Sequence, residues 1–221
     1  MNLLNKLERK FGRFYISNLM LYIVIGTGIV FAFQYLFSEI PLRDFLSFSK
    51  FAIMHGQIWR IISFIFIPES GSPISMVFWL YLYWMIGSSL EDYWGGFNFN
   101  VYYFSGVIFA VIGGFITGYA TVYCLNLSLF LAMAAVNPNM QLLLFFFLPV
   151  KMKWLAWVDA AFLIYLFIIG SWGDRVIIVM SLLNFLLFFG VDFLRLVREK
   201  VEFWERQSRF RNKNKYEKRN A

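Results

Sequence analysis

Apolar residues fill six long runs of the chain, and glycine, proline, asparagine or charged residues separate each run from the next. In lipid, every unsatisfied backbone polar group costs several kcal/mol, so a run of this kind must form a helix or be buried among helices. The pattern therefore predicts a helical bundle. The predicted helices, to within a few residues at each end, cover residues 17–37, 75–90, 100–119, 122–136, 154–170 and 176–192.

One stretch without charge is long enough to cross a membrane more than once, although several of the separate runs fall short of 20 residues. Residues 93–150 carry no charged side chain, about three times the roughly 20 residues that one helix needs to span the hydrocarbon core. Composition agrees, because a chain with 60% apolar and only 15% charged residues cannot cover a soluble surface of this size. We predict an all-α, polytopic membrane protein with six transmembrane helices. The fourth helix is the shortest and is expected to lie at the centre of the bundle.

The connection between the first two runs, residues 38–74, is long and yet rich in Phe, Ile, Leu and Trp. A water-exposed loop is rarely built in this way. We expect short helices that are half-sunk in the outer leaflet and packed against the side of the bundle. Trp59 and Arg60 would lie at the membrane interface, with the Arg60 guanidinium directed to phosphate or to backbone carbonyls.

Basic residues are distributed unevenly, and cytoplasmic connections retain the excess of lysine and arginine. With six spans, sixteen of the 20 basic residues lie on one side, in the segment 1–16, the 137–153 connection and the tail 193–221. The opposite side has four, which are Arg43, Lys50, Arg60 and Arg175. Both termini are thus predicted to be cytoplasmic, flanking a membrane domain of residues 17–192. Composition favours a bacterial plasma (inner) membrane.

The basic tail, residues 193–221, begins with charged and apolar residues in alternation. Its start suits an amphipathic helix on an anionic leaflet, where each basic residue adds about 1 kcal/mol of attraction. Membrane lipids are therefore the expected partners of these charges, and no nucleic acid is expected. The sequence leaves the oligomeric state open.

Three motifs stand at or between the runs. The first is Gly56-Gln57-Ile58-Trp59-Arg60, and the second is Gly87-Ser88-Ser89-Leu90-Glu91 followed by Trp94-Gly95. The third is Asn137-Pro138 ahead of an apolar run and a basic Lys151-Met152-Lys153. Together they resemble the rhomboid superfamily of intramembrane serine proteases over about residues 17–192. The resemblance implies a rhomboid-like bundle with a membrane-embedded first loop. Glu91 is expected to fix a loop by accepting hydrogen bonds from amides at a helix start.

Active rhomboids resemble one another in a Gly-x-Ser-Gly motif on the fourth helix and a histidine on the sixth. The matching positions here keep Ser128 but replace the first glycine by Asn126, and the base is replaced by Ser181 or Asn184. The only histidine, His55, lies outside every predicted span. Because a serine hydroxyl is a weak nucleophile, loss of the base costs several orders of magnitude in rate.

The resemblance therefore implies a catalytically inactive, derlin-like membrane protein that binds transmembrane segments of client proteins. Asn126, Ser128, Ser181 and Asn184 would be polar contacts inside the bundle. Two alternatives stay open. One is an intramembrane serine protease with an atypical site on Ser128, assisted by Asn184 or water. The other is a small-solute transporter or channel, for which clear repeats and a charged pathway are lacking.

Three further features bear on chemistry. Asp159 is an acid inside the fifth run, where a carboxylate indicates a functional site unless it reaches water or first-turn amides at the helix start. Gly114 and Gly118 have the spacing of small residues at a helix contact. One histidine and one cysteine do not supply a metal site, and no cofactor motif is present.

Overall fold

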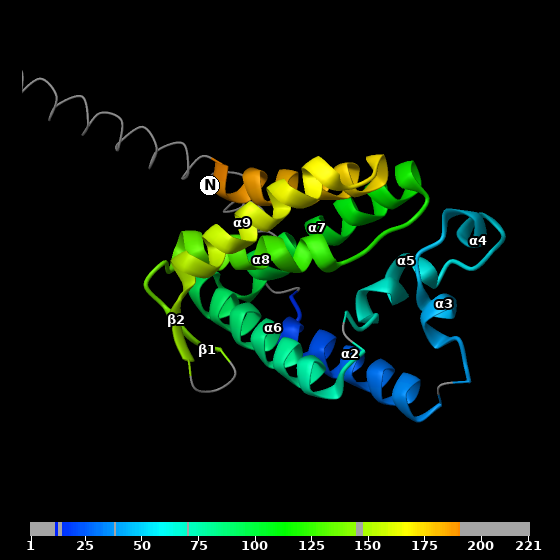
Figure 1. Cartoon of the computed structure of the whole chain (residues 1–221), viewed down its shortest axis with the longest axis horizontal. Coiled ribbons are helices and arrows are strands. Elements are labelled where there is room, and N and C mark those ends of the chain that lie inside the picture. The colour runs from blue at the N-terminus through cyan, green and yellow to red at the C-terminus, as the bar shows by residue number, and fades with distance from the viewer. Residues whose placement is uncertain (1–11, 13–14, 38, 70, 145–147, 191–221) are drawn as a thin grey trace, which may run out of the picture. The chain divides into compact units, whose positions relative to one another are not determined.

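The computed structural model describes residues 12, 15–37, 39–69, 71–144 and 148–190 (Figure 1). The predicted tail 193–221 and most of the segment 1–16 lie outside these residues. The chain divides into two units, Met1–Phe185 and Leu186–Ala221. The boundary falls inside the sixth predicted span, and the contacts discussed below all belong to the first unit.

Within the described residues, five helices are long and apolar enough to cross a membrane. They are α2 (Leu19–Leu36), α6 (Pro73–Trp94), α7 (Gly96–Thr117), α9 (Met152–Ile169) and a last helix, Trp172–Gly190. The fourth predicted span is α8, Tyr123–Val136, which has 14 residues. The chain is therefore mostly helical and has the helices of a multi-pass membrane protein. Each predicted run coincides with one helix to within four residues at either end.

Helix α8 lies at the centre of the first unit. It packs against α6, α7 and α9 (Figure 1). Most of its described side chains are buried, and Leu129 and Ala132 have no exposed surface. The prediction that the shortest run is central is confirmed. A 14-residue helix rises only about 21 Å, so neighbouring helices must shelter its ends.

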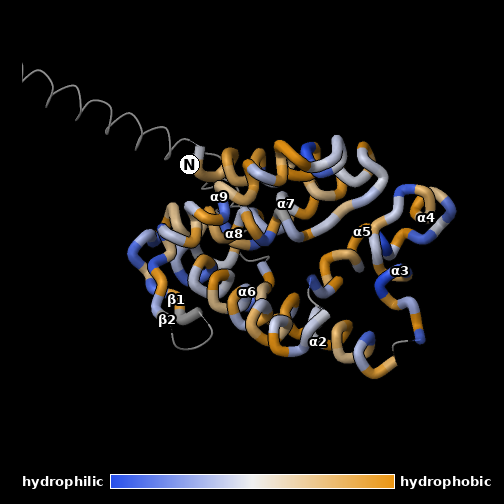
Figure 2. Tube along the Cα trace, in the orientation of Figure 1, coloured by the Kyte–Doolittle hydropathy of each residue, from blue (hydrophilic) through white to orange (hydrophobic). Residues whose placement is uncertain are grey.

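The first loop folds into short helices, as the sequence predicts. They are α3 (Leu42–Leu46), α4 (Lys50–Met54), α5 (Arg60–Ser63) and the 3-10 turn η1 (Phe64–Phe66). Figure 2 shows that apolar residues continue through this segment. Phe48 is buried and meets the rings of Phe64 and of Phe115 on α7 edge to face. The loop is thereby packed on the side of α7.

A small antiparallel hairpin follows α8, where the sequence predicts only a connection. Strand β1 covers Gln141–Leu144 and strand β2 covers Leu148–Lys151, with Gln141 opposite Lys151. The apolar run here is too short to span a membrane, and Pro149 disfavours a helix. Pairing as two strands satisfies its backbone instead, with the proline in a strand that has only one neighbour.

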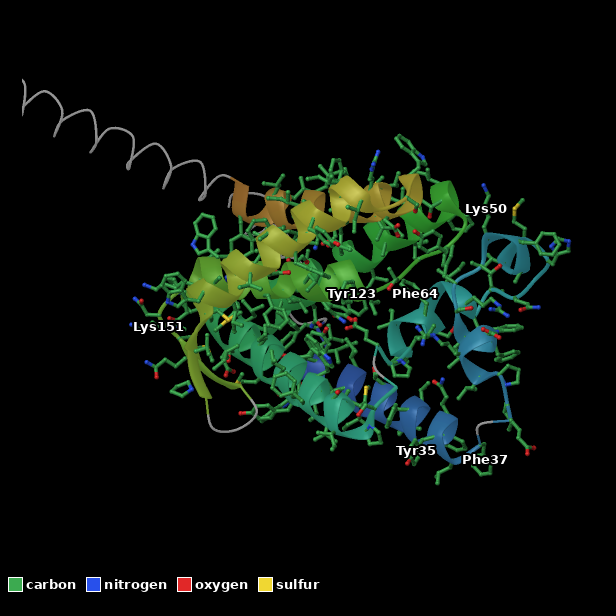
Figure 3. All side chains as sticks on the ribbon, in the orientation of Figure 1. Tyr35, Phe37, Lys50, Phe64, Tyr123 and Lys151 are labelled. Atoms are coloured by element: carbon green, nitrogen blue, oxygen red, sulfur yellow. The ribbon has the colours of Figure 1, made fainter. Side chains whose placement is uncertain are left out.

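The helices of the first unit have two common ends. One, named here the Glu91 end, holds the start of α2 and the end of α6, because the amide of Asn18 donates to Glu91. The opposite, Gly118 end holds the end of α7, where the amide of Lys50 donates to the Gly118 carbonyl. Lys50 and Lys151 lie at opposite ends of the helices (Figure 3). Neighbouring helices thus alternate in direction, as successive membrane spans must.

Candidate functional site

The polar residues of α8 face two different neighbours. Asn126 and Ser128 are two positions apart, so their side chains leave the helix on different faces. The Asn126 amide meets Glu69 of the first loop, whereas the Ser128 hydroxyl meets Tyr102 of α7. The four polar residues singled out from the sequence, Asn126, Ser128, Ser181 and Asn184, are all buried.

Ser128 has no exposed surface, and its hydroxyl is engaged within the bundle. It donates to the Leu125 carbonyl at 2.7 Å. The Tyr102 hydroxyl lies 3.1 Å from Ser128 Oγ and 3.2 Å from the Ser128 carbonyl oxygen. No histidine, lysine or carboxylate is bonded to Ser128 in the part of the chain that the structure describes. A neutral phenol does not accept a proton readily, so this arrangement does not activate the serine.

Asn184 is bonded to α7 rather than to Ser128. Its Oδ1 accepts from Ser105 Oγ at 2.7 Å, and its Nδ2 donates to the Tyr102 carbonyl at 3.1 Å. Gly106 allows this approach, because a Cβ there would lie 2.8 Å from Asn184 Nδ2. The amide therefore ties the last helix to α7, and Tyr102 bonds to Asn184 through its carbonyl and to Ser128 through its hydroxyl. Ser181 is buried one turn earlier on the same helix.

Glu69 is the functional residue that sequence reasoning missed. It follows η1 in the first loop and reaches into the bundle, where its Oε1 accepts from Asn126 Nδ2 at 2.8 Å. Its Oε2 accepts from the Tyr83 hydroxyl of α6 at 2.7 Å. The available signal was an acid placed directly between two apolar segments. Loop acids are usually solvated, and nothing in the sequence pairs Glu69 with Asn126, which lies 57 positions away.

Burial changes the chemistry of Glu69. It raises the pKa of the carboxyl above its ordinary value, because desolvation outweighs the hydrogen bonds from Tyr83 and Asn126 that favour the carboxylate. A cavity of about 30 Å³ adjoins the carboxyl. Its walls come from α2, η1, α6, α7 and α8 and are mostly apolar or aromatic. The site thus combines one carboxylate with a small, mostly apolar space that has room for one or two water-sized groups.

Arg60 holds the first loop together. The guanidinium is buried and donates to the carbonyls of Asp44 at 2.5 Å and Ser47 at 2.7 Å, and to Gln57 Oε1 at 2.7 Å. Of the two expected directions for this side chain, phosphate or backbone carbonyls, the structure has the carbonyls. Trp59 stacks on Phe45 with 5.2 Å between ring centroids. The chain turns at Gly56 with a φ of 97°, a conformation that glycine adopts readily.

The second motif lies where α6 meets α2. A Cβ on Gly87 would lie 2.6 Å from Met20 Cβ, so the glycine allows close approach of the two helices. Leu90 has no exposed surface in the same contact region. Glu91 Oε1 accepts from the Asn18 amide at 2.7 Å. The expected type of contact, an amide at a helix start, is found, but it belongs to α2 and not to the loop between α6 and α7.

The remaining motif residues end or begin helices. Trp94 ends α6 and packs edge to face against Tyr102, with 5.5 Å between ring centroids. Gly95 joins α6 to α7 with a φ of 82°. The amide of Asn137 caps the end of α8 by donating to Met133, and the Pro138 carbonyl accepts from the Lys153 amide at 3.1 Å.

The two glycines of α7 do not act as a pair. A Cβ on Gly114 would lie 2.7 Å from the Phe48 ring, so this glycine accommodates the first loop and not a second helix. Gly118 ends α7 in a left-handed conformation, with a φ of 96° and open space beside it. The predicted helix contact through Gly118 is wrong, because the residue is needed for its backbone conformation.

Asp159 and His55 lie in different surroundings, because Asp159 is buried and His55 is exposed. Asp159 is 7% exposed, and neither carboxyl oxygen has a hydrogen-bond partner among the described residues. It therefore does not bond to the first-turn amides as one expectation had it. His55 lies on the first loop, where Nδ1 is 2.7 Å from the Phe51 carbonyl, and it is exposed.

Among residues 12, 15–37, 39–69, 71–144 and 148–190, no group of three His, Cys, Asp or Glu side chains could hold a metal ion. No protein-family model matches the sequence, and no curated protein is significantly similar to it.

Proposed function

We propose that the chain is a catalytically inactive, rhomboid-like membrane protein that binds transmembrane segments of client proteins. The observation that carries this proposal is the state of Ser128, whose hydroxyl is enclosed and bonded to Leu125 and Tyr102. A protease would need this hydroxyl to face substrate and a base. In this proposal Ser181 or Asn184 stands in place of the family histidine, and neither a hydroxyl nor an amide accepts a proton readily.

The motif residues support the rhomboid part of the proposal. Arg60 and Gln57 bond to each other within the first loop, and Glu91 bonds to the start of α2. These contacts give each motif residue a structural task that does not depend on catalysis. A protein that kept the scaffold and lost the chemistry would keep these residues and lose the histidine.

The distribution of charge supports an orientation with both termini in the cytoplasm. Arg43, Lys50 and Arg60 belong to the loop that packs at the Gly118 end. Arg175 joins them, because its neighbour Asp174 accepts from the Tyr119 hydroxyl at 2.6 Å. Lys151 lies at the opposite end (Figure 3). The four basic residues that the sequence assigns to the non-cytoplasmic side thus share one end of the bundle. This agrees with the rule that cytoplasmic segments retain the excess of lysine and arginine.

Client binding is supported by polar groups inside an otherwise apolar protein. Polar residues within a transmembrane segment are costly in lipid, and a partner that offers hydrogen bonds lowers that cost. The cluster of Glu69, Asn126 and Tyr83 offers such groups next to a cavity. A first loop half-sunk in the outer leaflet adds a second means, since locally thinner lipid lowers the cost further.

The test combines a chemical probe with a substrate. Purified protein and its Ser128→Ala variant are treated with a fluorophosphonate and, in liposomes, with a single-span protein. We expect no labelling, no cleavage, and co-purification of the single-span protein with both forms. Labelling and cleavage that disappear in Ser128→Ala would overturn the proposal and establish a protease.

A further inference from the structure

The Glu69 carboxyl, when it is ionised, has a charge that the described chain does not neutralise. Asn126 and Tyr83 each donate one hydrogen bond to it, and no described lysine, arginine or histidine forms an ion pair with it. A carboxylate has about four acceptor positions, so about two remain. A half-buried carboxylate without a counter-ion is costly, and a cation that reaches it gains an interaction that the described residues do not supply.

The space beside Glu69 suits a compact cation. The cavity of about 30 Å³ has room for one or two water-sized groups. Three aromatic residues, Trp79, Tyr83 and Tyr103, contribute to its wall. Ring faces attract ammonium groups, so the rings and the carboxylate favour the same kind of ligand. A guanidinium is larger and planar, and it fits a space of this size less well than an ammonium does.

We propose that this pocket receives a lysine side chain of the bound transmembrane segment. The inference rests on the proposed function and specifies which transmembrane segments the protein binds. Glu69 lies in the loop that precedes α6, at the Gly118 end of the bundle. A lysine placed one to two turns inside that end of a client helix can extend its apolar stem along α2 or α6 and bring its ammonium group to the carboxylate.

The experiment uses three single-span peptides that differ at one position near the Gly118 end, where they carry lysine, arginine or glutamine. Binding to the full-length protein in liposomes is measured by energy transfer. We expect the lysine peptide to bind at least about tenfold more tightly than the glutamine peptide, as a charged hydrogen bond predicts. The arginine peptide should lie between them.

Two variants test whether Glu69 causes the preference for the lysine peptide. Glu69→Gln should remove the preference for lysine, whereas Glu39→Gln, at an exposed acid of the same loop, should keep it. Melting temperature and size-exclusion profile establish that each variant is folded, and the peptide comparison on the unmodified protein needs no variant.

Each other outcome points to a different failure. Equal binding of the lysine and glutamine peptides to the unmodified protein would refute the lysine pocket and leave segment binding intact. A lysine preference that survives in folded Glu69→Gln would mean that another group supplies the charge. Failure of every peptide to bind would overturn the proposed function together with the inference.

Discussion

The backbone amide of Asn18 donates a 2.7 Å hydrogen bond to Oε1 of Glu91, a residue 73 positions away in the sequence. Asn18 precedes α2 in a left-handed conformation, with a φ of 55°. Its own side chain does not cap the helix. The Glu91 carboxylate therefore takes the place of a capping side chain and holds the start of α2 against the end of α6.

Removal of this carboxylate should loosen the Glu91 end. We expect Glu91→Ala to lower stability by about 1 kcal/mol, because a hydrogen bond to a charged group is lost at a partly exposed site. Glu91→Gln keeps an acceptor and should lose less. The melting temperature in detergent measures both, and Asp92→Asn, at the exposed neighbour, serves as the control. Equal melting temperatures for Glu91→Ala and Asp92→Asn would contradict the assigned role.

The contact of α2 with α6 through Gly87 predicts a compensating pair of substitutions. Gly87→Ala places a Cβ 2.6 Å from Met20 Cβ, and such overpacking costs about 1–3 kcal/mol. Gly28→Ala is the matched control, because its Cβ would lie at an ordinary 3.5 Å from Leu80.

A second substitution, Met20→Ala, should restore part of the stability that Gly87→Ala removes. With Met20→Ala in the same chain, Gly87→Ala should cost at least about 1 kcal/mol less than it does alone, since the Met20 Cγ and Sδ that also lie against the added Cβ are gone and only the Met20 Cβ remains. A double-mutant cycle on melting in detergent measures this coupling. Strictly additive effects would show that the two residues do not limit the approach of the helices.

Apolar periodicity was sufficient to predict the helices but not their contacts. The six runs could be located because lipid forces every backbone group to be satisfied locally, and this makes a span visible in one stretch of sequence. The β1–β2 hairpin could not be located, since its short apolar strands have no distinguishing length. Gly118 was misread because spacing alone cannot separate a helix contact from a helix end, and its φ of 96° decides the matter.

The candidate site was only half visible in the sequence. Asn126, Ser128, Ser181 and Asn184 were identified by position in a family pattern, and the structure buries all four. Glu69 was missed, because its significance depends on burial and on partners in α6 and α8. Contacts between residues so far apart follow from the packing of whole helices, and no local pattern encodes them.

The Arg60 guanidinium donates hydrogen bonds to three acceptors, so another positively charged side chain should not be able to replace Arg60. Arg60→Lys keeps the positive charge but cannot reach the carbonyls of Asp44 and Ser47 and the Gln57 side chain together. We expect faster proteolysis of the first loop in Arg60→Lys, measured as cleavage around residues 44–58 in detergent. Arg43→Lys, at an exposed position nearby, should leave the rate unchanged. A similar rate in both variants would argue against the anchoring role.

Asn184 should contribute to stability and not to activity. Asn184→Ala removes two buried hydrogen bonds, one from Ser105 Oγ and one to the Tyr102 carbonyl, which costs about 1–3 kcal/mol even though Ser105 Oγ still donates to that carbonyl. Asn184→His, which introduces an imidazole against α7, should not produce cleavage, because the Ser128 hydroxyl stays bonded to Leu125 and Tyr102. The control for stability is Asn139→Ala at an exposed amide. Cleavage of a single-span protein by Asn184→His that depends on Ser128 would contradict this prediction.

Glu69 predicts a dependence of stability on pH. Because burial raises the pKa of its carboxyl, the folded protein holds a proton that the unfolded chain releases near its ordinary value of 4.5. The contribution of Glu69 to stability is therefore fully present below pH 4.5 and is lost as the pH rises through the higher folded value. Glu69→Gln lacks this titration, so the melting temperature of the unmodified protein should fall relative to that of Glu69→Gln as the pH is raised from about 4 to 8. Glu39→Gln should follow the unmodified protein throughout, and parallel curves for all three proteins would show that Glu69 is not protonated more readily when folded.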